Sequence, residues 1–260
     1  MQVTLITHTP DPEKVVAAAA KLCYSKASIM DLMDGLSDEK TAAFLDKLNG
    51  LGHASPLEHA SFTFGIEGIS RSCLAQLTRH RIASPSVQSQ RYVDMSTAEM
   101  VVPPAIAEDG EAYEAFSQAI RSSKYAYDHL HKVLEDKHTE ELMIHDSTLS
   151  EHTARIKASK MANEDARFVL PEACQTRLML TMNARELNAF FNLRCCNRAQ
   201  WEIRRVADEM LKLVYPIAPH LFKDAGPGCA AGKGCTEGSM TCGHMVQVQD
   251  KYNKIKEALV

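Results

Sequence analysis

The sequence lacks any uncharged apolar run of about eighteen residues, so we expect no transmembrane helix. Its first residues, MQVTLITHTP, have too little basic charge and too short an apolar run for a signal peptide. A surplus of positive charge is also missing, because the formal net charge is −4, and this disfavours general affinity for nucleic acids or membranes. We therefore expect a cytoplasmic protein in which a local basic cluster meets any bound anion.

A segment rich in glycine and cysteine lies near the end of the chain. Six of the twelve glycines fall between Gly226 and Gly243, so we expect no regular helix or strand there and treat residues 223–260 as a separate tail. Three of the eight cysteines belong to this tail. The other five lie in apolar or helical patterns typical of reduced, mostly packed thiols: Cys23, Cys73, Cys174, Cys195 and Cys196.

The tail cysteines, Cys229, Cys235 and Cys242, allow several interpretations. With His244 they could form a metal site, but their gaps of five and six residues differ from the two-residue spacing of zinc ribbons. We assign no metal site. Metal binding, disulfide or redox exchange, and a flexible or oligomer-docking tail all remain open.

Hydrophobic periodicity predicts a mixed fold. Alternating apolar residues predict strands, and apolar residues at helical spacing predict helices. The order of these elements favours the α/β (α+β) class without the regular alternation of a doubly wound sheet, and neither a GxGxxG nor a Walker motif is present. We expect strands over residues 2–7, 60–68 and 175–182, and helices over residues 12–24, 38–51, 70–81, 106–136, 139–166 and 183–215, the last with a break near 195–197.

The stretch RHRIASPSVQSQRY, residues 79–92, combines arginines with hydroxyl and amide side chains. Gln76 shares a helix face with Arg79 and His80 at the expected last turn, and Pro85 favours a loop after Arg81. Arginine forks beside neutral donors predict an anion pocket. A well-capped, solvated helix end is the alternative explanation for such a basic triplet.

Two further segments carry polar groups of interest. In GHASPLEHASFTF, the spacing of His53 and His59 and the presence of Pro56 disfavour a zinc helix. In NARELNAFFNLRCCNRAQWEI, a continuous helix would place Arg194 on one face and Arg185 on nearly the opposite face. The two arginines would then address different ligands or different copies of a site, unless the helix is simply an arginine-rich surface helix.

Together these three segments resemble the flavin-dependent thymidylate synthase family, whose defining pattern is R-H-R followed by seven residues and a serine. Arg79, His80, Arg81 and Ser89 match this pattern in full, and the resemblance spans about residues 1–222. It implies a single catalytic domain with a central, mostly antiparallel sheet packed with long helices. It also implies a homotetramer with active sites at subunit interfaces.

The resemblance further implies an activity and a set of ligands. The expected reaction is reductive methylation of dUMP to dTMP, with methylenetetrahydrofolate as carbon donor, FAD as hydride source, NADPH as reductant and no enzyme nucleophile on the uracil ring. By motif matching, the residues expected to hold FAD are His53, Ser55, Arg79, His80, Arg81, Asn183, Arg185 and Arg198. Those expected to hold dUMP are Gln76, Gln88, Ser89, Gln90, Arg91, Arg167 and Arg194.

Two of these residues are the candidates for catalysis. Arg194 would offset the negative charge that builds on the pyrimidine. Ser89 could be a nucleophile, but the sequence offers no convincing adjacent base, so a hydrogen-bonding role is favoured. The chain departs from the family pattern at Val87, where glutamate or glutamine is frequent, and at Arg198, where histidine is common; Ala189 receives no role.

Two other classes of protein stay open. An RNA-binding or RNA-uridine-modifying protein could use the same arginines on a polynucleotide backbone, although the acidic net charge disfavours it. In a non-catalytic helical assembly module, the arginines would form interface salt bridges.

Overall fold

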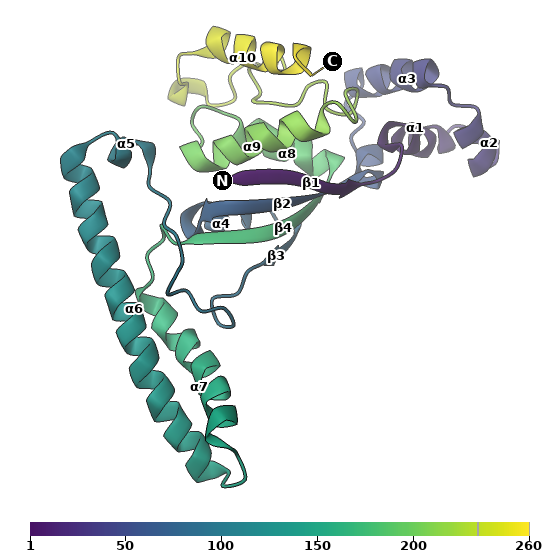
Figure 1. Cartoon of the computed structure of the whole chain (residues 1–260). Coiled ribbons are helices and arrows are strands. Elements are labelled where there is room, and N and C mark those ends of the chain that lie inside the picture. Colours follow the sequence, from purple (N-terminus) through teal and green to yellow (C-terminus); the bar gives the residue numbers. More distant parts are fainter. Residues whose placement is uncertain (233, 260) are drawn as a thin grey trace. The chain divides into compact units, whose positions relative to one another are not determined.

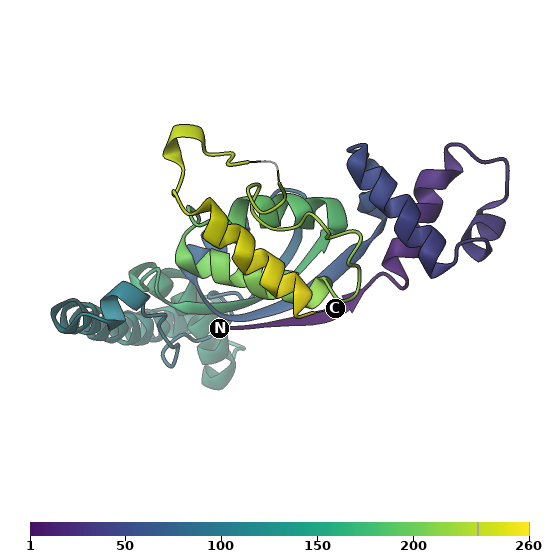
Figure 2. The same cartoon turned by 90° about the horizontal axis from the view of Figure 1, so that it is seen from above.

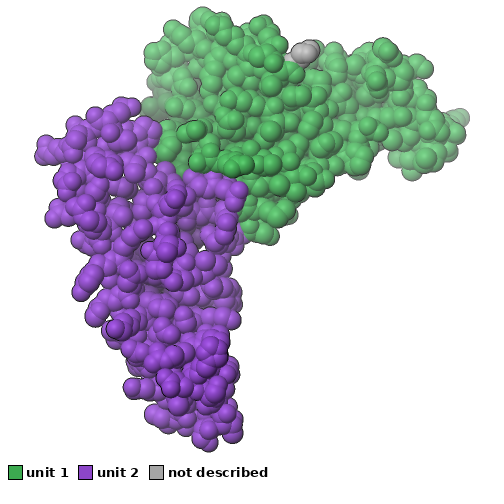
Figure 3. Space-filling model, viewed as in Figure 1, with its two compact units in different colours: residues 1–66, 75–86, 178–260 green, residues 67–74, 87–177 purple. Residues whose placement is uncertain are grey.

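A computed structural model describes residues 1–232 and 234–259. The chain forms two compact units, shown in different colours in Figure 3. Unit 1 comprises residues 1–66, 75–86 and 178–260, and unit 2 comprises residues 67–74 and 87–177. Residues 223–232 and 234–259 of the expected tail thus belong to unit 1.

Four antiparallel strands form the sheet, in the order β1-β2-β4-β3 (Figure 1). The strands are β1 (Gln2–His8), β2 (Ser61–Ser70), β3 (Ser84–Val87) and β4 (Gln175–Asn183). In β2, Phe62, Phe64 and Ile66 are fully buried, as their alternation predicts. Thr63 and Thr181 share a hydroxyl hydrogen bond of 2.9 Å between β2 and β4. The expectation of a mixed fold with an antiparallel sheet is confirmed.

Unit 1 places helices against this sheet. Figures 1 and 2 show α8 (Ala184–Arg194) and α9 (Trp201–Val214) beside the strands, and α10 (Met245–Glu257) beyond them. α9 is strongly amphipathic and buries residues that include Val206, Met210 and Val214. The other helices of unit 1 are α1 (Pro12–Leu22), α2 (Ile29–Asp34), α3 (Asp38–Gly50) and the 3-10 turns η1 (Ser55–His59) and η3 (Gly238–Met240).

An aromatic cluster forms the centre of unit 1. Phe62 and Phe191 both contact Phe222, with ring centroids 5.4 and 6.0 Å apart, and Phe190 contacts Phe191 at 5.9 Å. All four rings are fully buried. Edge-to-face contacts of this kind stabilise the core beyond the burial of area. The C-terminal half of α8 is therefore anchored firmly.

Unit 2 contains a long helical hairpin. The helices α6 (Gly110–His145) and α7 (Glu151–Ala166) pack against each other, and η2 (Arg167–Val169) follows directly. α5 (Pro104–Ala107) precedes them. The expected helix end at residue 136 is wrong, because α6 continues to His145. The polar stretch after it forms the turn, in which Ser150 Oγ caps α7 by accepting from Thr153 N at 3.2 Å.

The structure also corrects the segment around the basic triplet. α4 (Arg71–Leu77) ends four residues before Arg81, so the expected extension of this helix to residue 81 is wrong. Arg79 N and His80 N donate to Gln76 O and Leu77 O at 3.3 and 3.1 Å, so the chain continues as turns. Residues Ser84–Val87, expected as a loop, form the edge strand β3, where Pro85 is tolerated.

None of the helices among the described residues has an apolar stretch long enough to span a bilayer. Most cysteines are packed as expected, since Cys73, Cys174 and Cys195 are buried and Cys196 is half-buried, but Cys23 is exposed.

Candidate active site

The side chains of Arg194 and His80 meet in unit 1. Arg194 is the last residue of α8, and its Nε donates a hydrogen bond of 3.0 Å to His80 Nε2, across 114 residues of sequence. The accepting nitrogen carries no proton, so His80 is neutral with its hydrogen on Nδ1. This contact joins the R-H-R motif to the third family segment.

The surroundings of His80 favour its neutral form. Its ring lies edge-on to Phe190, with centroids 4.9 Å apart, and Phe190 is fully buried in the aromatic cluster. Burial and the neighbouring Arg194 charge lower the pKa of His80 below its usual 6.5. A neutral histidine therefore orients the arginine, because it accepts a hydrogen bond without adding a second charge.

Arg79 and Arg81 flank His80 and are both exposed, whereas Gln76 on α4 is half-buried. Two guanidinium groups open to solvent can meet an anionic ligand without a large loss of hydration. Arg79 and Arg81 remain candidates for binding the anionic part of FAD.

Other residues expected to hold FAD lie on α8 and next to it. Asn183 is the N-cap of this helix, and its Oδ1 accepts from Glu186 N at 2.9 Å. Residue 183, expected as the first residue of a helix, thus caps the helix and precedes its first turn. Arg185 is exposed and pairs with Glu58, a residue to which the sequence had assigned no function. Arg198 is exposed between α8 and α9.

His53 and Ser55 lie at a pocket of their own. They line a cavity of about 350 Å³ together with apolar side chains that include Phe44, Leu48 and Leu51. His53 also borders a cavity of about 220 Å³ with Asn188 and Asn192 of α8. All eight residues that we expected to hold FAD thus belong to unit 1.

Five of the residues expected to bind dUMP lie in unit 2, and two of them contact one carboxylate residue. Arg91 pairs with the Glu164 carboxylate at 2.9 Å, and Arg167 Nε donates to Glu164 O at 3.0 Å. Arg167 also lies over the ring of Phe168, 5.9 Å from its centroid. Glu164 therefore binds Arg91 through its carboxylate and Arg167 through its backbone carbonyl, although the sequence analysis assigned it no role.

The polar residues before Arg91 make local contacts. Ser89 Oγ accepts from Arg91 N at 3.2 Å, and Gln90 Nε2 lies 3.7 Å from Cys174 Sγ. With its amide oxygen turned toward Arg177, Gln88 accepts hydrogen bonds of 3.0 and 3.3 Å. Gln88 and Arg177 also line a cavity of about 340 Å³ within unit 2. Arg177, on β4, was not among the expected residues.

These side chains suit the two expected ligands. Exposed guanidinium groups at Arg79, Arg81 and Arg185 match the charge of a dinucleotide pyrophosphate. Arg91 is about half exposed and bound to a carboxylate, an anion that a nucleotide phosphate resembles in geometry. The donor set therefore fits FAD and a nucleoside monophosphate chemically. Unit 1 holds Arg194 and Gln76, and unit 2 holds the other dUMP candidates.

Comparisons with known proteins agree with this chemistry. Residues 4–220 match the Thy1 family model, described as thymidylate synthase complementing protein. The flavin-dependent thymidylate synthase of Clostridium tetani is 48% identical over 97% of either chain. That of Pyrococcus furiosus is 35% identical over 99% of either chain.

A solved structure is similar too. The crystal structure of the flavin-dependent thymidylate synthase from Helicobacter pylori, complexed with FAD and dUMP, matches with a TM-score of 0.55 and 26% sequence identity. The match covers 87% of this chain and all of that one. With the family model matching most of its length, this chain belongs to the flavin-dependent thymidylate synthase family.

Proposed function

We propose that this chain converts dUMP to dTMP by reductive methylation. The observation that carries the proposal is the 3.0 Å bond between Arg194 and His80, because it assembles two family motifs that the sequence separates by 114 residues. FAD, when bound, supplies the hydride. NADPH recharges it, and methylenetetrahydrofolate provides the carbon.

Arg194 supplies a fixed positive charge for the reaction. Negative charge builds on the carbonyls and ring nitrogens of the pyrimidine as the hydride and the methylene group are added, and a preorganised cation stabilises it. The bond to His80 fixes the plane of the guanidinium, which directional recognition requires. Ser89 acts as a hydrogen-bonding residue, since its hydroxyl accepts from a backbone N–H.

Arg91 and Arg167, which both contact Glu164, bind the phosphate of dUMP in this proposal. Arg91 and Arg167 both contact this residue, so both are held close to it before a ligand arrives. A nucleotide phosphate can take the place of the exposed carboxylate on Arg91, because both anions accept bidentate hydrogen bonds from a guanidinium. Gln76, Gln88 and Gln90 complete the proposed dUMP set.

FAD binding falls to unit 1 in this proposal. Arg79, Arg81 and Arg185 meet the pyrophosphate, while His53 and Ser55 contact the cofactor at the apolar pocket beside them. Asn183, His80 and Arg198 complete the set. The similarity to a structure that contains FAD and dUMP supports this assignment.

A homotetramer with active sites at subunit interfaces completes the proposal. Its support is the family resemblance. The hairpin region of unit 2 also exposes single large apolar side chains, among them Tyr125, Ile144 and Phe168, which are 74, 82 and 81% exposed. We place the enzyme in the cytoplasm, where its nucleotide and folate substrates occur. The family match favours it over an RNA-binding or RNA-modifying protein.

Release of tritium from dUMP labelled at C5 tests the function, because methylation at C5 expels that hydrogen. The purified protein should also take up FAD stoichiometrically. Arg79→Ala should weaken FAD retention, whereas Arg205→Ala, at an exposed position on α9, serves as the matched control. Absence of both FAD uptake and tritium release would refute the proposal, and RNA affinity with a steep salt dependence would favour the alternative.

A further inference from the structure

The cysteines of the tail take no part in the proposed reaction, yet the structure gathers them near the end of α8. The tail returns to the end of this helix, because Tyr252 OH of α10 donates to Cys195 O at 2.9 Å. Gln249 Nε2, one turn earlier, donates to Cys229 O at 2.8 Å. Both bonds are internal to unit 1.

Residues next to Cys196 and Cys229 in the sequence contact the segments that carry the other two tail cysteines. Asn197, next to Cys196, has its Nδ2 4.0 Å from Cys242 Sγ. Gly228, next to Cys229, lies so close to Thr236 that an added Cβ would be 2.9 Å from Thr236 Cγ2. The same Cβ would be 3.4 Å from Asn192 Nδ2 of α8. Cys196, Cys229, Cys235 and Cys242 therefore converge from four separate points of the chain.

The electrostatics of Cys229 point to the same cluster. Burial raises the pKa of its thiol, and Cys196, Cys235 and Cys242 raise it further, with Cys196 the largest of the three. Like charges raise a thiol pKa only when the groups lie near each other. Cys196 was not expected to be a member of this cluster, because it lies 33 residues before Cys229 and outside the tail.

The solvent exposure of the four thiols determines which reagents can reach them. Cys235 is exposed and the other three thiols are half-buried, so small reagents can reach them, and all four are free thiols. Among the residues that the structure describes, no group of three or more His, Cys, Asp and Glu side chains is placed to hold a metal ion. Thiols held in one region of the fold can exchange with a disulfide.

We propose that these four cysteines form a thiol–disulfide exchange site, in which Cys196 and one tail cysteine, Cys229, Cys235 or Cys242, form a disulfide that ties the tail to the end of α8. The oxidant is a low-molecular-weight disulfide such as oxidised glutathione. One protein thiolate attacks it, forming a mixed disulfide and releasing a glutathione thiolate. The second protein thiolate attacks the protein sulfur and releases the second glutathione. Two protons leave the protein, and the two electrons reside on two glutathione thiols.

Peptide mapping tests this proposal. The full-length protein is reduced, freed of reductant without oxygen, treated with oxidised glutathione and alkylated. We expect the number of free thiols to fall from eight to six, with a crosslink between Cys196 and a tail cysteine that dithiothreitol reverses. Cys196→Ser should abolish the crosslink, whereas Cys23→Ser, which removes an exposed thiol elsewhere in unit 1, should leave it intact.

Three outcomes would overturn the proposal. One is a full set of eight free thiols after treatment of the wild-type protein. Another is a crosslink that omits Cys196. The third is one bound equivalent of zinc that shields all four thiols, which metal analysis of the untreated protein would detect. The wild-type measurements decide the matter even where a serine variant does not fold.

Discussion

Unit 1 is built around four buried phenylalanine rings, whereas the helical hairpin of unit 2 is built around alanines and polar contacts. In α7, Ala154, Ala158, Ala162 and Ala166 are fully buried at a spacing of four residues. Small side chains let helices approach closely but bury little apolar area each. The hairpin therefore depends more on polar contacts between its helices than unit 1 does.

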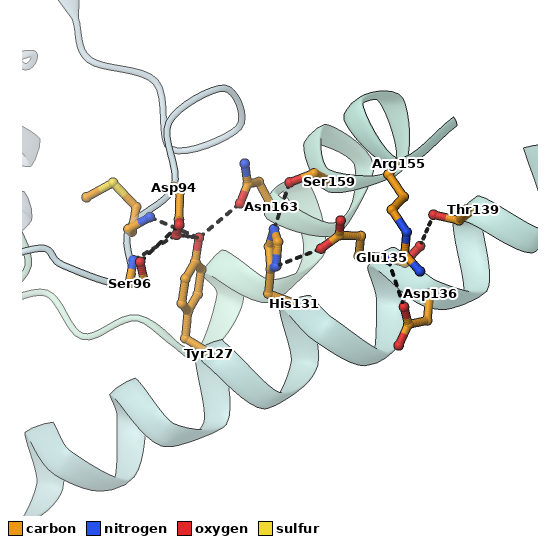
Figure 4. Close-up of polar contacts among 11 residues, drawn as sticks. Asp94, Ser96, Tyr127, His131, Glu135, Asp136, Thr139, Arg155, Ser159 and Asn163 are labelled. Atoms are coloured by element: carbon orange, nitrogen blue, oxygen red, sulfur yellow. Dashed lines mark hydrogen bonds and ion pairs between the residues drawn. The ribbon is translucent and has the colours of Figure 1, made fainter. Parts of the chain in front are cut away.

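Figure 4 shows these polar contacts along the hairpin. Tyr127 OH accepts from Met95 N at 3.0 Å and lies 3.0 Å from Asn163 Oδ1, to which it donates. Further along, His131 Nε2 lies 3.2 Å from Ser159 Oγ. Burial raises the pKa of Tyr127 to about 12, so its hydroxyl keeps its proton at physiological pH. A neutral hydroxyl can then both donate and accept.

The difference in packing suggests different roles for unit 1 and the hairpin of unit 2. In unit 1 an apolar core fixes α8 and hence the position of Arg194. The hairpin region exposes large apolar side chains, such as Ile144 and Phe168, that a partner subunit would cover in the proposed tetramer. Changes in unit 1 should therefore affect catalysis and folding most, and changes in the hairpin should have smaller, local effects.

The largest effect should come from Arg194→Ala. Loss of a preorganised cation should lower dTMP formation at least about 100-fold, because removing one charge-stabilising group from a reaction site typically costs that much. Flavin absorbance should be unchanged, since the proposed partner of Arg194 is the pyrimidine. Tritium release and flavin spectra measure the two properties. Arg205→Ala on the exposed side of α9 is the control. Loss of flavin together with activity would show that the assignment is wrong.

Phe190→Ala should strongly destabilise unit 1. It removes a fully buried ring that contacts both Phe191 and His80, and such substitutions cost about 3–5 kcal/mol in the free energy of unfolding. Urea denaturation measures the change. Leu193→Ala is the matched control, because Leu193 lies on the same helix and is 58% exposed. Equal effects of both substitutions would contradict the role of the aromatic core.

Tyr127→Phe should have an intermediate and local effect. It keeps the ring but leaves Met95 N and Asn163 Oδ1 without the hydroxyl, and an unpaired buried polar group costs about 1–3 kcal/mol. Hydrogen exchange should increase in α6 and α7 more than in α8. Tyr113→Phe, at a position on α6 that is 48% exposed, should change nothing. An equal increase of hydrogen exchange in both units would contradict a local role of this hydroxyl in the hairpin.

The smallest effect should be a pH dependence through His80. Its folded-state pKa lies below the unfolded value of about 6.5, so the unfolded chain binds the proton more tightly. Stability from this group is thus constant above pH 6.5 and falls as the pH decreases through the window between the two values. Activity should fall there too, because a protonated His80 cannot accept from Arg194.

His80→Gln sharpens this test. Glutamine offers an amide oxygen as acceptor but does not titrate, so the acid limb of the kcat/KM profile for dUMP should flatten. His129→Gln, in the hairpin helix α6, is the control and should leave the profile unchanged. An identical acid limb in wild type and His80→Gln would assign the titration to another group.

The sequence by itself determined much of this protein. Alternation in β2 and helical spacing in α8 and α9 identified elements and core residues, because burial of one face imposes a period on the chain. The motif serine and basic triplet identified the family. Local turn geometry was harder: β3 depends on pairing with β4, and the end of α4 depends on competing backbone hydrogen bonds, neither of which a local pattern encodes.

Only the tertiary structure decided which side chains meet. The pairing of Arg194 with His80, the pairing of Arg91 with Glu164, and the approach of Asn197 to Cys242 of the tail all join residues that are distant in sequence. Periodicity reports which face of an element is buried, but it carries no information on what that face contacts. Contacts between elements arise from packing of the whole chain, and for this reason they set the chemistry of the site.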